Sequence, residues 1–240
     1  MPRNAVLATI AAAFAILTPL AASAADLPAG FVHLKDVDPS IRQDMRYAGP
    51  DNFMGRPAAG YHAADCILAK QAANALAEVQ ATVAKYGLTI AVLDCYRPVS
   101  AVEDFVRWAK EGGGYDPRWN PRVKRDELIA QGYIASKSAH SRGSTVDLTL
   151  APLTGPVAAD ADCGATNMRA LDFGTGFDCF DPKSHTNASG LSTAPGINRK
   201  KLVEWMEAAG FVNYKSEWWH FTLKREPFKQ RFDFPVESGS

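Results

Sequence analysis

Apolar residues recur at helical spacing in several stretches of the chain. This spacing predicts α-helices over residues 64–85, over about 99–110 and, as a short element, over 125–131. A further helix is predicted over residues 199–209, where Asn198 can cap the first turn. A glycine follows closely after the first, second and last of these segments, which is typical of a helix C-terminus.

Other stretches have the pattern of β-strands. Residues 88–93 form a compact apolar run rich in β-branched side chains, which predicts a buried strand. Residues 211–214 and 218–223 also have strand character, and residues 31–37 are expected to contain a short strand. These segments alternate with helices in a way that favours a single α+β domain.

The strand predicted over residues 145–150 alternates between apolar and polar positions. Its valine and two leucines face the core, whereas Thr145, Asp147 and Thr149 face the other way. We therefore expect a small, mostly antiparallel sheet with flanking helices packed to one side. Residues 151–196 are polar and rich in Gly, Asp and Asn, and a stretch of that length without regular structure is usually functional or disordered.

The first 24 residues have the pattern of a secretory signal peptide. Arg3 gives a positive start, residues 5–20 are almost all apolar, and Ala22-Ser23-Ala24 is a small-x-small cleavage site. We expect cleavage after Ala24, which leaves residues 25–240 as one periplasmic domain without stable insertion in a membrane. An uncleaved membrane anchor is the alternative, although the apolar run is short for a span.

Net charge and cysteine content limit the classes of partner and indicate covalent cross-links. Loss of Arg3 with the signal peptide leaves 25 basic and 26 acidic residues, and this balance gives no indication of nucleic-acid binding. Four cysteines after a signal peptide predict disulfides. Three pairings are possible, of which Cys66–Cys95 with Cys163–Cys179 is the simplest. A thiolate metal site is the alternative, but the sequence has no C-x-x-C pair.

Two short segments hold the side chains that can carry chemistry. Asp147 follows His140 by seven residues and lies on the non-core face of its strand, where a buried carboxylate needs a cation or another partner. Glu217 and His220 flank two tryptophans, which would shield a site from water. Glu217 and His220 are three apart, so they share a site only if the backbone bends between them.

Two histidines and one carboxylate form a ligand set that suits zinc with an open fourth position for water. A bound cation lowers the pKa of such a water towards about 7. Glu217, as a carboxylate outside the ligand set, can accept the water proton. Arg97 follows a buried strand and can neutralise a developing oxyanion.

Each of these residues also has an ordinary structural interpretation. His140 can be a satisfied core or surface residue, and Asp147 can cap a turn or pair with Arg142. Glu217 can be a solvated acid at a strand edge. Arg97 can be the ion-pair partner of Asp94.

These residues lie in segments that resemble the D-Ala-D-Ala dipeptidases, which include the enzymes of vancomycin resistance. The two metal segments of that family resemble Ser136 to Leu150 and Glu217-Trp218-Trp219-His220-Phe221. Further blocks match in order along nearly the whole mature chain: Arg46-Tyr47-Ala48, Asp51-Asn52-Phe53-Met54-Gly55, Asp94-Cys95-Tyr96-Arg97-Pro98, Gly174-Thr175-Gly176-Phe177-Asp178 and Phe232-Asp233-Phe234-Pro235.

The resemblance implies a role for each site residue. It implies one zinc ion per chain on His140, Asp147 and His220, with Glu217 as general base and Arg97 as oxyanion stabiliser. It implies that Asp178 binds the free ammonium group of a small dipeptide, and that Ser138 and Tyr47 line the substrate site. An unpaired acid in a closed pocket selects substrates that bring a cation.

The chain departs from the family pattern in two places. Cys95 replaces a glycine and Cys179 follows Asp178, which a disulfide-stapled variant explains. The loop over residues 152–172 is longer than usual and is expected to affect dipeptide specificity. The expected activity is hydrolysis of D-Ala-D-Ala or a similar dipeptide in cell-wall turnover. A carboxypeptidase or peptidoglycan endopeptidase, and a non-catalytic zinc-binding domain, are the alternatives.

Overall fold

The computed structural model describes Met1 and residues 27–239. The expected signal peptide and its cleavage site lie outside the described residues, apart from Met1. The helices and strands in chain order are β1 (Phe31–His33), α1 (Leu34–Val37), β2 (Arg42–Gln43), β3 (Ile67–Ala69), α2 (Lys70–Ala84), β4 (Leu88–Asp94), α3 (Val99–Lys110), β5 (Thr145–Pro152), α4 (Thr193–Ala208), β6 (Phe211–Asn213) and β7 (His220–Leu223). Short 3₁₀ turns lie at Arg46–Ala48, Arg125–Glu127, His140–Arg142 and Pro182–Ser184.

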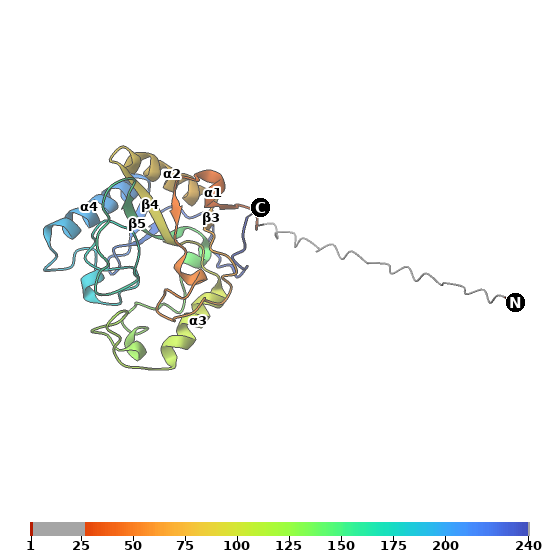
Figure 1. The fold of residues 1–240 in the computed structure, drawn as a ribbon, viewed down its shortest axis with the longest axis horizontal. Helices are drawn as coiled ribbons and strands as arrows, with labels where there is room; N and C mark the ends of the chain where they lie inside the picture. The colour runs from red at the N-terminus through yellow and green to blue at the C-terminus, as the bar shows by residue number, and fades with distance from the viewer. Residues whose placement is uncertain (2–26, 240) are drawn as a thin grey trace.

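A five-stranded sheet in the order β2-β4-β5-β7-β6 forms the centre of the molecule (Figure 1). The β2–β4 pair is parallel and the other three pairs are antiparallel, while β1 and β3 form a separate antiparallel pair. This confirms the predicted α+β fold with a mostly antiparallel sheet. The predicted alternation of β5 is also confirmed, since Val146, Leu148 and Leu150 belong to the hydrophobic core.

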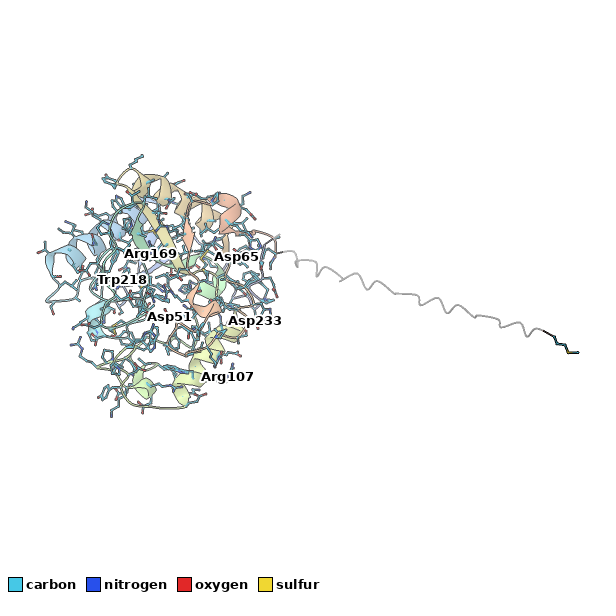
Figure 2. All side chains as sticks on the ribbon, in the orientation of Figure 1. Asp51, Asp65, Arg107, Arg169, Trp218 and Asp233 are labelled. Atoms are coloured by element: carbon cyan, nitrogen blue, oxygen red, sulfur yellow. A yellow bond between two sulfur atoms is a disulfide. The ribbon has the colours of Figure 1, made fainter. Side chains whose placement is uncertain are left out.

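The helices lie on two sides of the molecule. Helix α2 packs on β4 and on α4, and α1 lies beside α2, so these three gather on one side as predicted (Figure 1). Helix α3 lies apart from them, after the end of β4. Its first turn is capped by a distant residue, because the amide of Ser100 donates to Asp233 Oδ1 at 2.7 Å; Asp233 is labelled beside this region in Figure 2.

The predicted boundaries of several elements in the first half of the chain were wrong. Residues 34–37 form helix α1 rather than the end of a strand. Residues 67–69 form β3 rather than the start of helix α2, because they pair with β1. The predicted helix over residues 125–131 is reduced to the 3₁₀ turn Arg125–Glu127.

Two boundaries near the C-terminus also differ. Helix α4 begins at Thr193, six residues before the predicted start, so Asn198 lies inside the helix instead of capping it. Pro195 is tolerated because it falls in the first turn, where the amide has no helical partner. Strand β7 begins at His220, so the two tryptophans that precede it belong to a turn.

The structure contains two disulfides, Cys66–Cys95 and Cys163–Cys179, which is the simplest of the three pairings. Cys66–Cys95 joins the segment just before β3 to the residue that follows β4. Cys163–Cys179 joins two parts of the long irregular segment between β5 and α4. Throughout the described residues, every helix is too short or too polar to cross a membrane.

Candidate active site

His140, Asp147 and His220 come together near the start of β5, the middle strand of the central sheet. Asp147 on β5 lies directly opposite His220 on β7 in the strand register, and His140 lies in the turn that precedes β5. His220 Nδ1 is 3.0 Å from Asp147 Oδ1, and His140 Nε2 is 3.3 Å from Asp147 Oδ2. The turn is possible because Gly143 adopts a left-handed conformation with a φ of 76°.

These three side chains fit a metal ion. One ligand atom from each lies within 4.8 Å of the others, and the part of the chain described holds only this group of three or more such residues. Asp147 Oδ1 is buried, and its 3.0 Å approach to His220 Nδ1 lacks the geometry of a hydrogen bond, so a cation would satisfy an oxygen that has no hydrogen-bond donor. Burial alone raises the pKa of Asp147, but both histidines outweigh it and hold the pKa well below its ordinary value.

A backbone carbonyl orients the first histidine. His140 is buried and its Nδ1 lies 2.7 Å from the carbonyl oxygen of Cys95, so Nδ1 carries the proton and donates to that oxygen. This leaves Nε2 free to face Asp147 and His220. Metal-binding histidines usually have such a partner on the second nitrogen, because it fixes both the tautomer and the ring orientation.

Glu217 shares the site with His220 because the chain bends between them. Residues 214–219 form a turn in which the amide of Glu217 donates to Tyr214 at 3.0 Å. This brings Glu217 Oε2 to 3.5 Å from His220 Nδ1 and confirms the expected bend. Burial raises the pKa of the Glu217 carboxyl well above its ordinary value, and the negative charge of Asp147 adds to that effect.

Arg97 is an ion-pair partner of Asp94 and also reaches the candidate metal site. Its Nη2 lies 2.8 Å from Asp94 Oδ2 and 3.4 Å from Asp147 Oδ2. Tyr61 donates to the other oxygen of Asp94 at 2.5 Å. Asp94 therefore holds Arg97 at the site, a positioning role that sequence reasoning did not assign.

Asp178 is a buried acid that lines the same pocket. Tyr47 donates its hydroxyl hydrogen to Asp178 Oδ2 at 2.8 Å, and both residues are almost fully buried. Burial raises the pKa of Asp178 well above its ordinary value, although the hydrogen bond from Tyr47 opposes the rise. A carboxyl group in this position gains most from a cationic ligand, which would compensate for its lost hydration.

A pocket of about 260 Å³ unites the predicted residues. Seven of the eight line it, and His140 lies immediately behind, in contact with Asp147. The pocket also has an aromatic lining to which the sequence analysis gave no role; of these residues only Phe53 lies in a segment quoted for the family resemblance, and the others lie in loops and in α3 without a local motif. The additional lining residues include Phe53, Phe105, Tyr133, Phe180 and Tyr214.

The structure also shows where Arg142 and the long loop after β5 lie relative to the site. Arg142 does not pair with Asp147; it forms a bidentate ion pair with Glu226, with distances of 2.7 and 2.8 Å. The long loop over residues 152–172 does not line the pocket, although all of it is described, so it does not narrow the site by direct contact. Trp219 lines the pocket, whereas Trp218 packs behind it on Phe173.

Comparison with known proteins agrees with this geometry. Residues 28–237 match a family model described as D-Ala-D-Ala dipeptidase. A D-alanyl-D-alanine dipeptidase of Enterococcus faecalis (strain ATCC 700802 / V583) is 40% identical over 210 residues, which cover 86% of this chain and 98% of the relative. One from Streptomyces coelicolor (strain ATCC BAA-471 / A3(2) / M145) has the same identity and coverage. One from Escherichia coli (strain K12) is 32% identical over 192 residues, covering 80% of this chain and 83% of the relative. The chain therefore belongs to the D-Ala-D-Ala dipeptidase family of metallopeptidases.

Proposed function

We propose that this protein is a periplasmic zinc dipeptidase that hydrolyses D-Ala-D-Ala or a similar small dipeptide during turnover of cell-wall precursors. One observation carries the proposal. A single small pocket is lined by the ligand Asp147, by Glu217 outside the ligand set, and by Asp178, a buried acid suited to an ammonium group. Family membership supports the same activity.

His140, Asp147 and His220 hold one zinc ion. When bound, the ion supplies Lewis acidity and lowers the pKa of a coordinated water. Two imidazoles and one carboxylate are the donor set that zinc accepts with a position left open. The hydrogen bond from His140 Nδ1 to the Cys95 carbonyl keeps Nε2 available as the donor atom.

Glu217 acts as the general base. Its carboxylate accepts a proton from the attacking water and then delivers this proton to the leaving amine. The raised pKa suits this work, because a carboxyl group that ionises closer to neutral pH both accepts and returns a proton readily. Trp219 lines the same pocket and keeps bulk water from the carboxylate.

Arg97 stabilises the negative charge that develops on the carbonyl oxygen of the scissile bond. Its guanidinium is held by Asp94 and lies over the rings of Tyr47 and Phe105, 5.1 and 5.0 Å from the ring centres. A donor fixed in place before the reaction needs no reorganisation when the charge appears. The pairing with Asp94 is therefore part of the function of Arg97.

Asp178 binds the free ammonium group of the dipeptide, with Tyr47 fixing one carboxylate oxygen. Ser138 completes the wall of the pocket, and its hydroxyl oxygen accepts the His140 amide at 3.2 Å. An N-blocked or longer peptide brings no cation to Asp178 and leaves a buried acid unpaired. Such substrates are rejected because an unpaired buried charge is costly.

The periplasmic assignment depends on the signal peptide over residues 1–24, with cleavage after Ala24. An N-terminal sequence determined on protein purified from the periplasm tests it. A mature chain that begins at Ala25 supports export. A chain that retains Met1 or Pro2 and is found with the membrane fraction would favour the uncleaved anchor, and one found only in the cytoplasm would contradict export.

The activity is tested with purified residues 25–240 and D-Ala-D-Ala, with and without a chelator, beside the N-acetylated dipeptide. We expect chelator-sensitive release of D-alanine from the free dipeptide alone, restored by zinc. Cleavage of the acetylated peptide as well would favour a carboxypeptidase or endopeptidase. Zinc binding without any turnover would favour a non-catalytic domain.

A further inference from the structure

The segment that carries Asp178 has no regular secondary structure. Residues 173–181 lie between β5 and α4, and only the 3₁₀ turn Pro182–Ser184 follows before α4. Asp178 itself has a φ of 59°, a left-handed conformation that residues other than glycine rarely adopt. Neither a helix nor a strand register fixes this backbone, so other contacts must hold the carboxylate in place.

The contacts on both sides of Asp178 include a disulfide and two hydrogen bonds from residues 163–165, in the long loop that follows β5, while Trp119 and Ser184 hold the residues just beyond. Cys163 is bonded to Cys179, the residue directly after Asp178. The amide of Gly176 donates to the Cys163 carbonyl at 2.7 Å, and the amide of Ala165 donates to the Phe177 carbonyl at 2.8 Å. Asp178 is thus held on both sides by a single short segment.

The two backbones lie so close that a side chain has no room between them. A Cβ added at Gly164 would lie 2.5 Å from the carbonyl carbon of Gly176 and 2.6 Å from the Phe177 oxygen. Cys179 is almost fully buried and Cys163 nearly so. This packing restrains the backbone of residues 176–179, while the hydroxyl of Tyr47 restrains only the end of the Asp178 side chain.

We propose that the Cys163–Cys179 disulfide, together with the backbone of residues 163–165, is a positioning element for Asp178 that sets the selectivity for a free amino terminus. The proposal rests on the ammonium-binding role given above to Asp178. It assigns a function to the long loop over residues 152–172, which never reaches the pocket. The loop acts on the substrate through Asp178, by holding its backbone in the left-handed conformation.

The main test compares the wild-type chain with Cys163→Ala/Cys179→Ala on D-Ala-D-Ala and on its N-acetylated form. We expect KM for the free dipeptide to rise about tenfold, because displacement of a binding group by about 1 Å weakens a charged contact strongly. We expect kcat to stay within about twofold, because Glu217 and the metal ligands lie on other elements. Preference for the free over the acetylated peptide falls by the same factor as kcat/KM.

Gly164→Ala provides a second variant that keeps the disulfide. Its added methyl group pushes on Gly176 and Phe177, so it is expected to raise KM in the same way. Val83→Ala is the matched control, since Val83 is buried in α2 away from the pocket. It lowers the unfolding midpoint without a change in KM. If the double cysteine variant does not fold, Gly164→Ala against Val83→Ala decides the question.

A double-mutant cycle with Asp178→Asn separates positioning from general stability. Asp178→Asn alone should raise KM, and removal of the disulfide in that background should then add little, because both changes remove the same contact. Additive effects, or an unchanged KM in Cys163→Ala/Cys179→Ala, would overturn the positioning role alone. If Asp178→Asn itself leaves KM and selectivity unchanged, the ammonium role in the proposed function fails first.

Discussion

The proposed site has a metal half, with His140, Asp147 and His220, and a substrate half around Asp178, and the two are held by different means. The metal half is built on the sheet, where the register of β5 and β7 sets Asp147 opposite His220. The substrate half is built on an irregular segment, where a disulfide and two backbone hydrogen bonds hold the residues around Asp178. Paired strands fix the positions of their side chains through the repeated hydrogen bonds of the sheet. A loop has no such ladder, so specific cross-links must fix its backbone.

The comparison explains where the two cysteine pairs lie. Cys66–Cys95 ends at the carbonyl that orients His140, so it supports the metal half. Cys163–Cys179 ends beside Asp178, so it supports the substrate half. Each half of the proposed site therefore has one disulfide beside a residue with a proposed role. Only in the metal half are such residues also part of the central sheet.

The largest expected effect comes from removing a ligand in the metal half. His220→Ala should abolish turnover and release zinc on dialysis, because two of the three donors hold the ion too weakly. Metal content by atomic emission after dialysis measures this, beside circular dichroism to show that the fold remains. His62→Ala is the control, since His62 is exposed and paired with Glu237. Unchanged zinc content in His220→Ala would remove this residue from the site.

Glu217→Ala should separate metal binding from catalysis. We expect it to keep zinc but to lose about 10²- to 10⁴-fold in kcat, since the other two acids that line the pocket, Asp147 and Asp178, are assigned to the metal and to the substrate ammonium group. Steady-state kinetics at equal zinc content gives the result. Glu204→Ala, which changes an exposed acid on α4, is the matched control. Retention of more than about a tenth of the wild-type rate would exclude the general-base role.

Removal of the two disulfides should have similar effects on stability but different effects on zinc affinity. Loops of 29 and 16 residues predict that each contributes about 3–4 kcal/mol of stability through the unfolded chain, so both double-alanine variants lose similar stability. Cys66→Ala/Cys95→Ala should in addition weaken zinc binding, because the Cys95 carbonyl holds His140. Cys163→Ala/Cys179→Ala should leave zinc affinity unchanged. Competition with a chromogenic chelator measures the difference, and equal zinc affinities would contradict it.

The residue pattern of the sequence predicted more of the metal half of the proposed site than of its substrate half. Strict alternation over residues 145–150 was enough to place Asp147 on the face away from the core, and the structure agrees. The carbonyl that orients His140 was not predictable, because it comes from a residue 45 positions away and involves no side chain. No local pattern marks Asp178 either, and only the family resemblance indicated it.

The errors in the fold have a common physical cause. Residues 67–69 have the same apolar spacing as the helix that follows, and only their pairing with β1, which is remote in sequence, makes them a strand. Pro195 and Gly196 lower the local helix propensity, yet tertiary contacts hold the first part of α4, where Pro195 is buried and Asn198 Nδ2 donates to the Asp172 carbonyl at 2.8 Å. Local propensity decides an element only where tertiary contacts do not oppose it.

The smallest expected effect is a pH-dependent one in the substrate half. Asp181, three residues after Asp178, accepts a hydrogen bond from Arg122 Nε at 2.6 Å. Burial alone raises the pKa of Asp181, but the ion pair with Arg122 and the Lys183 amide outweigh it, so its pKa lies below the ordinary value. A lowered pKa means that the ionised group stabilises the fold at neutral pH. That contribution declines as pH falls below about 4 and is lost below the folded-state pKa.

Arg122→Ala should therefore lower the unfolding midpoint slightly at pH 7, with a difference from wild type that shrinks as the pH falls below about 4. Arg122 is more than half exposed, so screening by solvent keeps the effect small. Thermal unfolding across this pH range measures it, with Lys200→Ala on the surface of α4 as control. A difference that grows on acidification would show that Asp181 is not held ionised by Arg122. The segment that carries Asp178 and Asp181 would then be held by the Cys163–Cys179 disulfide and the backbone contacts alone, without a contribution from the Arg122–Asp181 ion pair.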